Sequence, residues 1–181
     1  NFSFSSDKLF KECQSKAYLL SGVKIVWTCK KELVKNEQTL TNEIFCYPNG
    51  IIDFLNGSIS SDYLHNKIHF TGDVKLKEKN TSNLNGSINW VCNWSLNHTQ
   101  FFRSYCNLIH TPDGGTHETG FWNAILKGVK SYGELVGNKK VAQIIKEDIS
   151  SHLCGIISLF ISNPTFSGQT KDKLTTQEVI K

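Results

Sequence analysis

Residues 88–96 read INWVCNWSL, and apolar and polar side chains alternate along this stretch. Its apolar members share one side of an extended chain: they are Ile88, Trp90, Cys92, Trp94 and Leu96. Because successive side chains of a strand point to opposite faces of its sheet, this alternation predicts a strand with one strongly apolar face. We expect that face to be covered by helices.

Further strands are expected on both sides of this stretch. Runs rich in β-branched and aromatic residues, bounded by turn signals, are typical of strands. Such runs occur at 23–29, 43–47, 67–74, 101–109 and 154–161. We expect the run at 101–109 to pair with 88–96 as an antiparallel neighbour. The polar stretch at 75–86 lacks periodicity and is predicted to be a mobile loop.

The longest helix is predicted at 116–136, where apolar residues recur at helical spacing and Glu118 suits the positive end of the helix dipole. We expect its buried stripe to be formed by Phe121, Ala124, Ile125, Gly128, Val129, Tyr132 and Val136. Its opposite side carries Asn123, Lys127, Lys130 and Glu134. Shorter helices are expected near 6–20, 51–55 and 147–153, and from Thr176 onward.

Strands therefore come partly as hairpins and partly separated by helices. This order predicts the α+β class, as a two-layer α/β sandwich with a mixed sheet and helices on one face. A length of 181 residues suits one domain, and we find neither an internal repeat nor an interdomain linker. We therefore expect a single domain over residues 1–181. The sequence begins at Asn1 and contains no Met, so we expect a piece of a larger protein.

Composition indicates a globular protein. Hydrophobic residues make up 39% and charged residues 20% of the chain, which is ordinary for a folded domain. No apolar run approaches the roughly 20 residues that span a bilayer, so no membrane partner is expected. The net charge of +4 permits a nucleic-acid partner without requiring one.

Cysteines and sequons leave a second class open, that of a secreted, disulfide-bonded glycoprotein. The cysteines are even in number: Cys13, Cys29, Cys46, Cys92, Cys106 and Cys154. Asn-x-Ser/Thr sequences begin at Asn1, Asn56, Asn80, Asn85, Asn93 and Asn97. Asn93 lies on the polar face of its predicted strand, which leaves that sequon open to modification. Metal binding is not expected, because no two cysteines form a C-x-x-C pair.

The start of the long helix carries a glycine pair and a histidine. Signatures of common hydrolases and complete phosphate-binding loops are absent from the sequence. Gly114 and Gly115 indicate a tight turn before the helix. His117, beside Glu118, is predicted to cap or pack the first helical turn rather than to react.

The segment Gly168-Gln169-Thr170-Lys171 is better suited to chemistry. An ammonium supplies mobile positive charge and an amide supplies an oriented donor, so a glycine-containing loop with both can bind phosphate oxygens. The alternative is a solvated surface loop, because lysines are usually exposed.

Several stretches, in this order, resemble the central part of the ATPase subunits of bacterial type IIA DNA topoisomerases. They are 47–54 (YPNGIIDF), 105–107 (YCN), 112–121 (PDGGTHETGF), 132–135 (YGEL) and 166–174 (FSGQTKDKL). The Gly-Gly-Thr-His-Glu and Gln-Thr-Lys elements are hallmarks of that family, and the match extends over essentially the whole chain. These stretches are more similar to the ATPase subunit of topoisomerase IV than to that of DNA gyrase, which is the alternative.

The resemblance implies the transducer domain of a GHKL ATPase, with an uncommon left-handed βαβ crossover. It implies that the Gln-Thr-Lys loop enters the ATP site, where Lys171 is a catalytic contact of the γ-phosphate and Gln169 hydrogen-bonds to it. ATP and Mg²⁺ would be cofactors of the full-length subunit. The ATP-binding and DNA-cleavage domains would lie outside residues 1–181, so we expect the fragment alone to be inactive.

The implied function is ATP-driven DNA strand passage, a topological change that serves chromosome segregation in the bacterial cytoplasm. The implied partners are the ATP-binding domain of the same subunit, a second copy in a homodimeric gate, the A-type subunit of topoisomerase IV and duplex DNA. Lys127 and Lys130 are candidates to line the DNA cavity, since lysines attract phosphates of any sequence. A solvated helix face is the alternative. The family commonly carries Arg where this chain has Trp122, which we expect to pack beside the apolar stripe.

Overall fold

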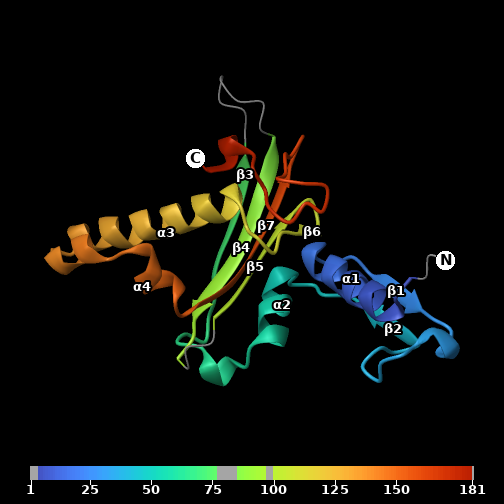
Figure 1. The fold of residues 1–181 in the computed structure, drawn as a ribbon. Helices are drawn as coiled ribbons and strands as arrows, with labels where there is room; N and C mark the ends of the chain where they lie inside the picture. The colour runs from blue at the N-terminus through green and yellow to red at the C-terminus, as the bar shows by residue number, and fades with distance from the viewer. Residues whose placement is uncertain (1–3, 77–84, 97–99, 181) are drawn as a thin grey trace. The chain divides into compact units, whose positions relative to one another are not determined.

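The computed structural model describes residues 4–76, 85–96 and 100–180 (Figure 1). The chain forms two compact units, Asn1–Ser58 and Ile59–Lys181. Each unit has its own helices and strands. That both belong to one functional domain stays a prediction.

The first unit contains two helices and a two-stranded sheet. Its elements are α1 (Ser6–Leu19), β1 (Ile25–Thr28), the 3₁₀ helix η1 (Lys31–Leu33), β2 (Asn42–Phe45) and α2 (Ile51–Ser58). β1 and β2 pair antiparallel, as their sequence predicts. Aromatic rings join α1 to this sheet: Phe10 lies edge-on to Trp27 and Phe45, with ring centroids 5.7 and 5.1 Å away.

The second unit is built on a five-stranded mixed sheet. In their spatial order the strands are β3 (Phe70–Leu76), β4 (Gly86–Trp94), β7 (Leu153–Ile161), β5 (Phe101–Cys106) and β6 (Ile109–His110). β5 and β7 run parallel, and every other neighbouring pair is antiparallel. The sheet is therefore mixed, as predicted.

The expected pairing of the strand at 101–109 with the strand at 88–96 is wrong. β7 lies between β4 and β5 and hydrogen-bonds to both. Its side chains are buried on both faces, with only Phe160 partly exposed, which is typical of a central strand. The chain passes from β5 to β7 through β6, α3 and α4, and the predicted left-handed crossover at this connection stays a prediction.

Helices cover the apolar face of this sheet. α3 (Thr116–Leu135) and α4 (Lys146–Ser150) contribute to the core, and the unit also contains the 3₁₀ helices η2 (Ser61–Tyr63), η3 (Lys139–Gln143) and η4 (Gln177–Ile180). Phe121 and Trp122 of α3 pack on Cys92 of β4 and on Leu153 and Ile157 of β7. The predicted α+β class and the apolar face of the 88–96 strand are thus confirmed, although Leu96 at its end is 61% exposed.

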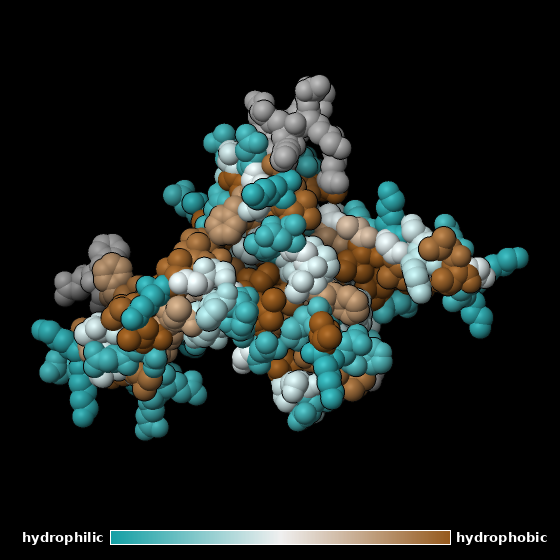
Figure 2. All heavy atoms as spheres, turned by 180° about the vertical axis from the view of Figure 1, so that it is seen from behind, coloured by the Kyte–Doolittle hydropathy of each residue, from teal (hydrophilic) through white to brown (hydrophobic). Residues whose placement is uncertain are grey.

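The buried stripe of α3 differs from the predicted one. Phe121, Ile125 and Val129 face the core as expected, and they are joined by Trp122 and Leu126. Other predicted members are exposed: they are Ala124, Gly128, Tyr132 and Val136. Figure 1 shows the cause, since the second half of α3 extends beyond the sheet. Figure 2 shows apolar atoms exposed among polar ones at this outer end.

Other elements differ from the expected ones. The single strand expected at 101–109 is two antiparallel strands, β5 and β6, with a turn at Asn107 and Leu108 between them. β3 and β4 extend into the predicted loop at 75–86, of which residues 77–84 lie outside the described part. The sequons at Asn1, Asn80 and Asn97 also lie outside it. The last predicted helix is a single 3₁₀ turn. Among the described residues, no helix has both the length and the apolar character needed to cross a membrane.

Candidate functional site

The Gln-Thr-Lys segment forms the tip of a tight hairpin after β7. The two arms are joined by backbone hydrogen bonds from Ser167 N to Lys173 O (3.0 Å) and from Thr175 N to Thr165 O (2.8 Å). Leu174 in one arm also forms a bridge with Phe166 in the other. The tip is therefore a defined backbone structure and not an irregular loop.

The tip projects Gln169, Thr170 and Lys171 into solvent. Lys171 N donates to Gly168 O at 3.2 Å, which closes a turn, and Lys171 has a φ of +62°. This left-handed conformation costs a non-glycine residue about 1 kcal/mol, and such strain gathers at functional positions. The Lys171 Nζ atom lies 5.9 Å from the centre of the Phe166 ring, which supports the lysine side chain. A Cβ atom added to Gly168 would have no neighbouring atom within 4 Å.

The hairpin is bound to the segment that begins α3. Asp113 N donates to Asp172 O (3.0 Å), Leu174 N to Gly114 O (3.0 Å) and Thr116 N to Leu174 O (3.1 Å). Gly115, with a φ of +136°, lies so close that a Cβ atom there would be 2.2 Å from Leu174 O. The glycine is required both by its backbone conformation and by this approach.

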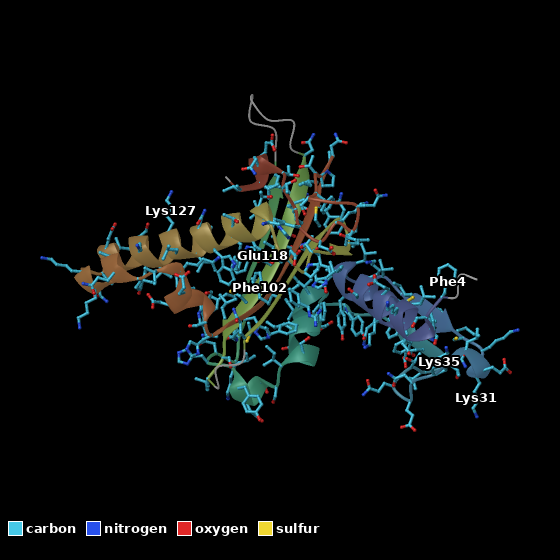
Figure 3. The ribbon with its side chains drawn as sticks, viewed as in Figure 1. Phe4, Lys31, Lys35, Phe102, Glu118 and Lys127 are labelled. Atoms are coloured by element: carbon cyan, nitrogen blue, oxygen red, sulfur yellow. The ribbon has the colours of Figure 1, made fainter. Side chains whose placement is uncertain are left out.

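Glu118 lies over the preceding glycine. A Cβ atom on Gly114 would be 2.7 Å from the Glu118 carboxylate. Burial raises the pKa of Glu118, while a hydrogen bond from Ser104 and the charge of Lys146 lower it. Figure 3 shows Glu118 at the end of α3 that lies on the sheet. The glycine pair is thus a tight turn, as predicted, and its neighbours explain why both members lack side chains.

His117 is buried, with 1% of its surface exposed. Its Nε2 atom lies 3.1 Å from Thr111 Oγ1. Burial lowers the pKa of His117 to about 4, so the imidazole is neutral at physiological pH. The predicted packing role is confirmed; capping is not, because no side chain caps this helix start. Sequence reasoning missed Thr111 and its partner Ser104, since neither residue type signals a buried role.

The two candidate DNA-contacting lysines have different surroundings. Lys127 is exposed and points away from the sheet (Figure 3). Lys130 is partly buried, and its Nζ atom donates to Ala142 O of η3 at 3.3 Å. Lys127 lies roughly 16 Å along the helix from Thr116. The structure therefore does not bring these lysines together with Gln169 and Lys171.

Trp122 packs as predicted. It is 6% exposed, and its ring lies 4.8 Å from the ring of Phe102 on β5. Lys146 Nζ lies 5.7 Å from the Trp122 ring.

The loop chemistry suits an anion. Residues 169–171 offer an amide, a hydroxyl and an ammonium to solvent. Over residues 4–76, 85–96 and 100–180, no group of three or more His, Cys, Asp or Glu side chains could hold a metal ion. The side chains present therefore fit a phosphate ligand better than a cation.

Comparison with known proteins gives the family. A sequence model of the DNA gyrase B family matches residues 50–181. The chain belongs to the DNA gyrase B family. Its predicted resemblance to the type IIA topoisomerase ATPase subunits is thereby confirmed.

Relatives within this family include both predicted subunit types. The B-type subunit of DNA topoisomerase 4 from Bartonella bacilliformis is 38% identical over 98% of this chain and 25% of its own length. The B-type subunit of DNA gyrase from Metamycoplasma hominis is 31% identical over 98% of this chain and 26% of its own length. The chain spans about a quarter of these relatives. The solved topoisomerase IV ATP-binding domain of Francisella tularensis has a TM-score of 0.72 at 26% identity, covering 99% of this chain and 45% of that chain.

Membership of the DNA gyrase B family argues against the secreted glycoprotein, and so do the side chains. Asn93 has no exposed surface, and its Nδ2 atom donates to Asn66 O at 2.8 Å. The polar face of β4 is buried at this point, so the sequon cannot take a glycan in the folded chain. None of the cysteines, all of which lie in the described residues, forms a disulfide, and burial raises the pKa of the Cys92 thiol to about 12.

Proposed function

We propose that this chain is the transducer region of an ATP-hydrolysing type II DNA topoisomerase subunit of the topoisomerase IV type. It would couple ATP binding and hydrolysis to DNA strand passage. The observation that carries the proposal is the exposed Gln169–Lys171 tip, held by backbone hydrogen bonds to the start of α3. The ATPase subunit of DNA gyrase is the second candidate; the higher identity to the topoisomerase 4 relative favours the first.

Two boundaries support a proposal for the extent of the transducer. The family match begins at residue 50, and the sheet-based unit begins at Ile59. We assign the transducer to this second unit, within the predicted span of residues 1–181. The first unit lies mostly outside the family match.

Lys171 would act on the γ-phosphate of ATP bound by a neighbouring domain of the same subunit. When bound, ATP supplies the transferable phosphoryl group, and Mg²⁺ neutralises part of its charge. The Lys171 ammonium would stabilise the negative charge that develops on the phosphate oxygens, and the Gln169 amide would donate to one of them. The Mg²⁺ ligands and the general base would come from residues outside this chain.

The proposed partners follow from strand passage. They are a second copy of the subunit, the A-type subunit of topoisomerase IV and duplex DNA in the bacterial cytoplasm. Lys127 is the better candidate to face DNA, because it is exposed and points away from the sheet. Lys130 would first have to leave Ala142 O.

The test is ATP turnover by the complete subunit with Lys171→Ala. We expect kcat to fall by about 30-fold or more, which corresponds to about 2 kcal/mol of barrier, with ATP affinity largely kept. Lys173→Ala is the matched control, since Lys173 is exposed on the same hairpin. Equal turnover by the two variants would contradict the proposal.

A further inference from the structure

We propose that Thr111 and His117 are positioning residues for Lys171. They fix the segment at 111–117, to which the hairpin carrying Lys171 is bound. This inference rests on the proposed role of Lys171 at the γ-phosphate. It adds to that role the residues that determine where the Lys171 ammonium is held.

The hairpin takes its position from a short stretch of backbone. The three hydrogen bonds that join it to the α3 start involve only backbone atoms of 113–116 and of Asp172 and Leu174. Because Gly115 is in backbone contact with Leu174, the two segments cannot slide past one another without losing these bonds. A displacement of 113–116 would therefore carry the Lys171 tip with it.

The stretch at 111–117 is in turn fixed to β5 by buried side chains. Thr111 N and Thr111 Oγ1 both donate to Ser104 O, at 2.9 and 3.0 Å. Ser104 Oγ lies 3.1 Å from Thr111 O and 2.7 Å from Thr111 Oγ1, within hydrogen-bond distance of both. His117 Nε2 is a further hydrogen-bond partner of Thr111 Oγ1, at 3.1 Å. Ser104 and Thr111 are each 1% exposed, so water does not compete for these bonds.

The polar cluster formed by Ser104, Thr111 and His117 lowers the free energy of unfolding relative to an apolar core, because some polar atoms are buried there without partners. His117 Nδ1 and Thr116 Oγ1 are buried without a hydrogen-bond partner. Such atoms are rare in folded proteins and cost about 1–3 kcal/mol each. The cluster thus adds little net stability, whereas its directional bonds define one orientation of the α3 start relative to the sheet. That property suits a positioning role.

The experiment is a double-mutant cycle in the complete subunit. Thr111→Val removes the hydroxyl and keeps the shape, and Thr111→Ser restores the hydroxyl. We expect Thr111→Val to lower kcat about tenfold or more with the KM for ATP little changed, because small misplacements of a catalytic group slow turnover strongly. Thr111→Ser should stay close to the unmodified subunit. In a Lys171→Ala background, Thr111→Val should have no further effect on kcat.

A merely structural role would give a different pattern. The proposal would be overturned if Thr111→Val lowered kcat by the same factor in the unmodified subunit and in the Lys171→Ala background. It would also be overturned if Thr111→Val did not lower kcat at all. If Thr111→Val does not fold, Ser104→Ala takes its place, since it removes the bond to Thr111 O without adding atoms.

Hydrogen exchange separates this inference from the proposed function. We expect faster exchange of the amides at 165–175 in Thr111→Val, and unchanged exchange of the Ser167 and Thr175 amides in Lys171→Ala. Unchanged exchange in Thr111→Val would overturn the inference while Lys171 keeps its role. An unchanged kcat in Lys171→Ala would instead overturn the proposed function and, with it, the positioning of Lys171 for catalysis.

Discussion

His117 is a single buried imidazole whose pKa is lowered from 6.5 to about 4 by burial. Between these pH values the unfolded chain binds a proton that the folded chain does not. Stability is therefore lost as the pH falls through this window, by at most about 1.4 kcal/mol per pH unit. Glu118 acts in the opposite direction, because its pKa is raised and the folded state binds its proton more readily.

His117→Gln should flatten this dependence, since an amide can hydrogen-bond to Thr111 Oγ1 as donor or acceptor and does not titrate. Urea unfolding of both proteins at pH 7, 6 and 5 measures it. We expect the difference in unfolding free energy between the two to shift in favour of the variant as the pH falls. Parallel curves would show that the imidazole is protonated in the folded protein as readily as in the unfolded one.

The sequence indicates some residues of the proposed phosphate-binding site but not the residues that support them. Gln169 and Lys171 carry the amide and the ammonium that a phosphate-binding loop needs, and their proposed role comes from the resemblance of the Gln-Thr-Lys element, because an exposed lysine alone is usually only solvated. Thr111 and Ser104 are not predictable, because their role depends on a contact between β5 and the start of α3. The left-handed backbone conformation of Lys171 could not be predicted either, because lysine rarely adopts a positive φ.

At the scale of elements, α3 divides into a half on the sheet and a half beyond it. Phe121 is 6% exposed and Leu135 is 83% exposed, although both are large apolar residues of the same helix. We expect Phe121→Ala to lower the unfolding free energy by about 3–5 kcal/mol. Leu135→Ala should change it by less than about 0.5 kcal/mol. Chemical denaturation of the two variants checks the assignment, and similar losses would mean that the outer half is also covered.

The sequence predicts where most strands lie along the chain, but it does not predict which strands are neighbours in the sheet. Alternation along residues 88–96 depends on a local property, the period of the strand. The position of β7 between β4 and β5 depends on pairs of residues 53 to 75 positions apart in sequence, which no local pattern encodes. The continuous apolar run of β7 was the one available signal for a central strand.

At the scale of the whole molecule, the two units differ in their capacity to fold alone. The second unit has a five-stranded sheet and its own core. The first has a two-stranded sheet, which is marginal without further strands. We expect residues 59–181, expressed alone, to unfold cooperatively, and residues 1–58 alone to lack a cooperative transition. Circular dichroism during thermal unfolding measures both, and a cooperative first unit would contradict this division.

The open space around Gly168 has a practical consequence. A cysteine there would meet no neighbouring atom, and the residue needs no left-handed backbone. A fluorescent dye attached at this point would report the motion of the hairpin tip without displacing any part of it. Cys92, Cys106 and Cys154 are buried and would react slowly with the dye, so only the remaining thiols would need replacement before labelling.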